Sequence, residues 1–228
     1  METHFVTVRR YVMRNIFSYD SALMRFLTRL FDIVVLSVTY AICALPVITI
    51  GAAQAGLSSG VRAMLEPNGS ISPIRAFFKG FASGFAKITI VWFFCLIPIV
   101  CVIYIIYGAV VTETQIQFPF LLISCIIAIS AMVFQIMATL LHSRFDCKLL
   151  DLIKNSWLMV ITYPLRTLVM AVFTWAPLLF AIIEPYIFLA YSPVFVFFYY
   201  GLSFMLCYYL IRKPFQKIQD IYFPDSNT

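Results

Sequence analysis

Residues 33–61 read IVVLSVTYAICALPVITIGAAQAGLSSGV, a stretch without a formal charge that is interrupted by Leu45-Pro46. A membrane-spanning helix needs roughly 20 apolar residues, so the stretch is long for one span and short for two. Pro46 removes a backbone donor and disfavours helix at the residue before it. The sequence therefore predicts a tight helical hairpin over residues 27–65, with two near-complete spans or a re-entrant segment as the two variants.

The rest of the chain has the composition of a membrane protein. Hydrophobic residues make up 63% of it and charged residues 11%, whereas a soluble domain carries about 25% charged residues. Long uncharged runs cover residues 88–112, 114–141 and 185–211, and a shorter one covers 167–183. These runs predict further membrane-spanning helices, and the composition excludes a soluble globular domain.

The basic residues fix the expected orientation. The sixteen Lys and Arg residues fall in four clusters, at 9–29, 62–87, 144–166 and 212–217. A chain that turns back near Pro46 keeps all four clusters on one side, whereas a single span there would place the second cluster outside. Basic loops face the cytoplasm, so both termini are expected to be cytoplasmic. The net charge of +6 is assigned to orientation and to anionic lipid, and no nucleic-acid partner is expected.

These patterns predict an all-α polytopic membrane protein with about six transmembrane helices. The four later spans are expected over about 87–108, 118–141, 164–183 and 186–211. The chain forms a single membrane domain, 1–228, divided into a cytoplasmic segment 1–26, the hairpin 27–65, a surface helix plus two spans at 72–141, a second such unit at 147–211, and a cytoplasmic tail 212–228.

Two amphipathic helices are expected on the cytoplasmic surface. The first starts at Ser72-Pro73 and carries an apolar stripe, and the second covers about 148–160. An alternative for the first helix is that it simply extends the next span. The stripe consists of Ile74, Phe77, Phe78, Phe81 and Phe85, and the second helix carries Leu149, Ile153 and Trp157 on one face.

Small residues recur at helical spacing after the hairpin turn. Gly51, Ala55 and Ser59 lie one turn apart, and so do Ala52, Gly56 and Gly60, which lets helices approach closely in lipid. Thr49 is expected to cap the returning helix. A helix break of this kind also occurs at substrate or partner contacts. The candidate packing or partner-contact residues are Pro46, Thr49, Gly51, Gly56, Gly60, Phe77, Phe78, Phe81 and Trp157.

No catalytic constellation is found. HExxH and phosphate-binding glycine motifs are missing from the sequence, so an enzyme is not expected. The six cysteines form no CxxC pair, which gives no support for a metal site or a disulfide framework. No cofactor is expected.

The segment LPVITIGAAQAGL at residues 45–57, followed by the phenylalanine-rich basic helix at 74–85, resembles the YesL family (DUF624) of bacterial membrane proteins. In that family a span ends in an LPVVTIG-type segment followed by small residues. Ala52 stands where the family pattern has Pro, and the second half of the chain matches in pattern only.

The resemblance implies location in the bacterial plasma membrane and no transferable activity. Genes of the family often lie beside carbohydrate ABC importers, which implies an accessory or regulatory role in carbohydrate uptake, with permease subunits as partners. The hairpin and the repeated unit suggest an alternative, an autonomous small transporter or channel for an uncharged solute. The sugar and the oligomeric state do not follow from the sequence.

Overall fold

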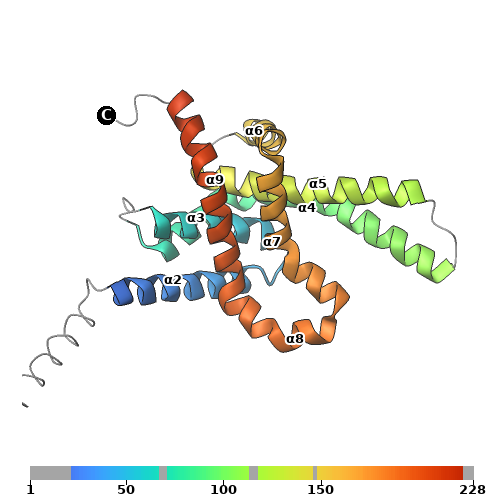
Figure 1. Ribbon diagram of the computed structural model, residues 1–228, viewed down its shortest axis with the longest axis horizontal. Coiled ribbons are helices and arrows are strands. Elements are labelled where there is room, and N and C mark those ends of the chain that lie inside the picture. The colour runs from blue at the N-terminus through green and yellow to red at the C-terminus, as the bar shows by residue number, and fades with distance from the viewer. Residues whose placement is uncertain (1–21, 67–70, 113–117, 146–147, 223–228) are drawn as a thin grey trace, which may run out of the picture.

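The computed structural model describes residues 22–66, 71–112, 118–145 and 148–222, and these form helices and no strand (Figure 1). Most of the predicted N-terminal segment, the external loop near residue 113 and the end of the tail lie outside this part of the chain. The elements are α2 (Ala22–Cys43), a 3-10 turn (Val47–Thr49), α3 (Ile50–Leu65), α4 (Pro73–Thr112), α5 (Phe118–Arg144), α6 (Leu149–Thr162), α7 (Pro164–Ile183), α8 (Pro185–Val194), a π-helical turn (Phe195–Tyr199) and α9 (Tyr200–Tyr222).

Four helices in the described ranges are long and apolar enough to cross a membrane, which confirms an all-helical membrane protein. They cover residues 26–43, 73–108, 119–144 and 189–215. A fifth span results if α6 and α7, which meet at a bend of 107°, count as one broken span. Helix α3 has 16 residues and a length of about 24 Å, less than the ~30 Å of the hydrocarbon core. The count of about six spans therefore stays a prediction.

The helical break of the hairpin lies at Pro46, as the sequence predicts, and α3 runs back along α2. A Cβ on Gly60 would lie 2.6 Å from Leu36 Cδ2, which sets the two helices antiparallel. From Gly51 to Val61 every residue of α3 is buried except Ser59. Contacts with α2, α4, α5 and α9 surround α3, so it forms the centre of the bundle and faces little lipid.

The predicted boundary between a first surface helix and the third span does not exist. Residues Pro73–Thr112 form one continuous helix of 40 residues, which agrees with the alternative that the first amphipathic segment extends the next span. The reason is packing: Phe77 is fully buried and its ring and carbonyl lie against Gly56 of α3. The apolar stripe of residues 74–85 is therefore partly packed inside the bundle and partly exposed on its surface.

In the second half α5, α6 and α7 lie close to the predicted bounds, whereas α9 continues to Tyr222, beyond the predicted end of the last span at residue 211. Helix α6 is a separate element ahead of α7, and its apolar side chains Leu152 and Met159 are buried against the bundle. Helices α8 and α9 continue one another through the π-helical turn. After that turn, the backbone N–H of Gly201 donates to Ser37 Oγ of α2 at 2.9 Å, so the turn joins the C-terminal helix to the hairpin.

Candidate functional site

The end of α3, the first turns of α4 and the end of α5 meet at one end of the bundle, called here the basic end (Figure 1). Arg62 Nη1 donates to the backbone carbonyl of Ser143 at 2.7 Å. The guanidinium of Arg144 lies 5.6 Å from the ring centroid of Phe215 in α9. These contacts join the second, third and fourth basic clusters. Since α2 and α3 are antiparallel, α2 also begins at this end.

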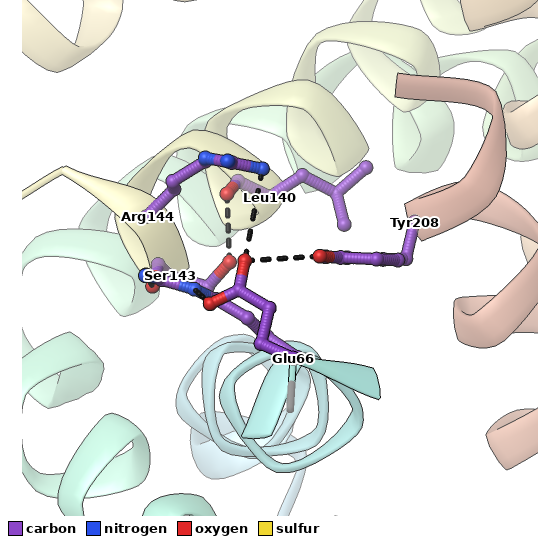
Figure 2. Close-up of polar contacts among 6 residues, drawn as sticks. Glu66, Leu140, Ser143, Arg144 and Tyr208 are labelled. Carbon is purple, nitrogen blue, oxygen red and sulfur yellow. Dashed lines mark hydrogen bonds and ion pairs between the residues drawn. The ribbon is translucent and has the colours of Figure 1, made fainter. Parts of the chain in front are cut away.

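Glu66 is the centre of a polar network at the basic end, shown in Figure 2. Its Oε2 accepts from Arg62 Nε at 3.0 Å, and its Oε1 accepts from the Tyr208 hydroxyl at 2.9 Å. Arg144 Nη1 lies 3.9 Å from Oε1. The side chain of Glu66 is 30% exposed and that of Arg144 12%. Because such partly buried charges are less screened than surface pairs, the network ties α3, α5 and α9 together.

Beside this network lies a polar groove of about 430 Å³ between α3, α4 and α5. Its size is that of a small-molecule site. His142 is buried, and its Nε2 lies 3.3 Å from Ser83 Oγ. No three His, Cys, Asp or Glu side chains of the described residues come together to hold a metal ion. The polar lining includes Ser59, Arg62, Glu66, Lys79, Ser83 and His142.

The glycines singled out in the sequence lie in the contacts of α3 with its neighbours. A Cβ added to Gly51 would lie 2.9 Å from Trp92 Cβ, and one on Gly56 would lie 2.9 Å from the Phe77 carbonyl. Helix α4 also contributes glycine to this contact. A Cβ on Gly80 would collide with Ser59 of α3. The small residues thus allow α3 and α4 to approach at backbone distance.

The hydroxyl of Thr49 does not cap the returning helix. It donates to the carbonyl of Cys43 at 2.6 Å and to that of Pro46 at 2.8 Å, and no side-chain cap bond forms at α3. Thr49 has φ −91° and ψ −2°, which is helical and not the extended conformation of an N-cap. The hydroxyl instead satisfies carbonyls left open where α2 ends.

The aromatic candidates and Pro46 divide between packing and surface. Phe77 is buried, Phe81 is half-buried and Phe78 is 52% exposed. Trp157 is 46% exposed and its ring lies 5.4 Å from that of Phe134. Pro46 is exposed at the turn. The exposed side chains are those available to a partner or to lipid.

The sequence reasoning missed the Glu66 network and the groove. Two signals were present: Glu66 is the single acidic residue between Asp32 and Glu113, and it follows Arg62 by four residues, a spacing that places both side chains on one helix face. The bond of Tyr208 to Glu66 joins residues far apart in the chain, which no local pattern reveals.

A second polar contact lies deep in the bundle. Gln135 Nε2 of α5 donates to Gln54 Oε1 of α3 at 3.1 Å. Gln54 is 4% exposed and Gln135 is fully buried, and Tyr40 of α2 lies beside Gln54. Polar side chains between helices in lipid act as links, so this contact fixes α2, α3 and α5 relative to each other.

Residues 30–107 match the family described as "Protein of unknown function, DUF624". The match covers roughly a third of the chain, from α2 to most of α4, and includes Arg62, Glu66 and Lys79. In this part the chain is similar to that family, in agreement with the resemblance of the hairpin segment. No curated protein and no solved structure matches the chain.

Proposed function

We propose that the protein is an integral-membrane accessory or regulatory subunit that docks on a permease subunit of a carbohydrate ABC importer. The class of partner follows from the family resemblance of the hairpin segment. The observation that supports docking is the length of the exposed apolar surface on α4, which is greater than a bilayer can cover.

The candidate span of α4, Pro73–Gly108, has 36 residues and includes Arg75, Lys79 and Lys87, and it corresponds to about 54 Å of helix. At a tilt of about 40°, the upper end of the usual range, it still spans about 41 Å, against ~30 Å of hydrocarbon. About 10 residues at the basic end therefore lie outside the hydrocarbon. Helix α4 begins at Pro73, so this segment is residues 73–82.

Two large apolar side chains in this segment lie on the surface. Ile74 is 42% exposed and Phe78 is 52% exposed, one helical turn apart on the face away from α3. Outside lipid, exposed aromatic and aliphatic side chains of this size are typical of interface centres. A permease subunit lies in the same membrane and offers apolar helices at the same depth, so it fits this surface.

The orientation proposed with this function has six spans, both termini in the cytoplasm, and a bacterial plasma membrane. The meeting of three basic clusters at one end of the bundle supports this orientation, because basic ends face the cytoplasm. Helices α2 and α3 then form the first two spans, and α6 lies along the cytoplasmic surface.

The alternative of an autonomous transporter needs a polar path through the bundle. At the level of Gln54 and Gln135 the two amides are bonded to each other and buried. A solute would have to separate α3 from α5 to pass between them. The packing therefore favours the accessory role, and the transporter stays the second hypothesis.

The test is purification of tagged protein from its native host in mild detergent, with mass spectrometry of co-purifying proteins. A permease subunit is expected in near-stoichiometric amount. The double variant Ile74→Ala/Phe78→Ala should retain it at least about fivefold less, since interface aromatic truncations cost more than about 1 kcal/mol.

The matched control is Ile97→Ala/Val100→Ala, on the same helix but within the length that lipid covers. Ile97 and Val100 are each 58% exposed, and their truncation should leave partner retention unchanged. Recovery of the wild-type protein without any transport subunit would refute the proposal, and equal loss in both variants would refute the docking surface.

A further inference from the structure

The groove at the basic end has an unbalanced charge. Glu66 is its one carboxylate among the described lining residues, and both oxygens of Glu66 are engaged by Arg62, Tyr208 and Arg144. Lys79 lines the same groove and is exposed, and it forms no ion pair within the described part of the chain. The carboxylate is thus neutralised internally, and the Lys79 ammonium remains available to a ligand.

The other polar groups of the groove are suited to an anion. Arg62 lines the groove and uses Nε for Glu66 and Nη1 for the Ser143 carbonyl, so its second terminal nitrogen takes no part in these two bonds. Ser59 and Ser83 also line the wall, but their hydroxyl groups donate to the carbonyls of Ala55 and Gly80. One ammonium and one guanidinium beside a small cavity are groups that bind phosphate oxygens.

The depth of the groove matches that of lipid phosphates. Lys79 lies 29 residues before Gly108, the far end of the candidate span. That distance is about 43 Å along the helix, or about 33 Å across the membrane at a tilt of about 40°. At this upper tilt the ammonium is just beyond the ~30 Å hydrocarbon core, and at smaller tilts it lies farther toward water, so that headgroup phosphates and water-soluble phosphates both reach this region.

We propose that this groove binds a phosphate group, with Lys79 as its main charge partner and Arg62 as a further donor. The phosphate belongs either to an anionic lipid headgroup or to a water-soluble phosphate ester. The groove volume of about 430 Å³ accommodates a headgroup-sized ligand.

The test uses the full chain in nanodiscs of phosphatidylcholine, with two probes. One arm adds phosphatidylglycerol at a few mole per cent and measures by native mass spectrometry which lipid stays bound. The other arm titrates sn-glycerol 3-phosphate by calorimetry. Binding in the first arm alone identifies the lipid, binding in the second alone identifies a soluble ester, and binding in both supports the shared phosphate chemistry.

The variant Lys79→Gln should lower the affinity for the bound probe about tenfold, since it removes a charge-assisted hydrogen bond. Its matched control is Lys154→Gln, an exposed lysine of α6 that does not line the groove, and it should change binding less than about twofold. Because Lys79 is exposed, its variant is expected to fold, which thermal unfolding verifies. Failure of both probes to bind, or equal weakening by the two variants, would overturn the proposal.

Discussion

Replacement of Gly56 by Ala tests the close approach of α3 and α4 that forms the centre of the bundle. The added methyl group would lie 2.9 Å from the Phe77 carbonyl and 3.1 Å from two atoms of its ring. A backbone carbonyl of α4 cannot move aside like a flexible side chain, so the helices must separate. Overpacking of this kind costs about 1–3 kcal/mol, against a gain of about 0.5–1 kcal/mol from Gly→Ala in a helix.

The net expectation for Gly56→Ala is a loss of about 0–2.5 kcal/mol, centred near about 1.3 kcal/mol, which lowers the melting temperature by about 3–5 °C. Gly108→Ala is the matched control, because a Cβ there meets nothing within 4 Å and should leave stability unchanged or raised. Reaction of the buried thiols Cys95 and Cys207 with a fluorogenic maleimide reports unfolding in mild detergent. A melting temperature that rises equally in both variants would refute the close-packed α3–α4 contact.

Three further substitutions probe the contacts that join the helices. Tyr208→Phe removes the hydroxyl that donates to Glu66 and should lower stability by about 1.5–3 kcal/mol; an unchanged thiol-reactivity melting curve would contradict a role for this bond. Thr49→Val removes two hydrogen bonds at the hairpin turn and should cost about 0.5–1.5 kcal/mol, seen as faster proteolysis at the turn, with Thr49→Ser as the rescuing control. Gly201→Ala would place a methyl group 2.6 Å from Ser37 Oγ and should cost about 1–3 kcal/mol; a wild-type melting temperature would show that the π-helical turn does not dock on α2.

The apolar runs and the prolines predicted most of the helix boundaries. Helix α7 has the predicted bounds, and α5 and α6 differ from the prediction by three residues or fewer. Pro46 marked the hairpin turn and Pro164 the start of α7 because proline removes a backbone donor wherever it stands. These are local effects, which a single sequence displays directly.

The structural features that the sequence did not predict depend on contacts between residues far apart in the chain. The Phe77 stripe suggested a helix on the membrane surface, but burial of Phe77 on Gly56 makes it part of a continuous α4. The Glu66 network likewise includes Tyr208, which lies 142 residues later in the chain. The groove forms only because α5 packs beside α4. Hydrophobic periodicity gives the faces of a helix and does not say which face meets protein and which meets lipid.

Impermeant thiol labelling in intact cells tests most directly the orientation on which the docking surface and the groove depend. Lys79→Cys at the basic end and Glu184→Cys at the exposed turn between α7 and α8 are introduced singly after replacement of the six native cysteines. We expect Glu184→Cys to react in intact cells and Lys79→Cys to react only after permeabilisation. The reverse pattern, or reaction of both in intact cells, would contradict a bundle whose basic end faces the cytoplasm.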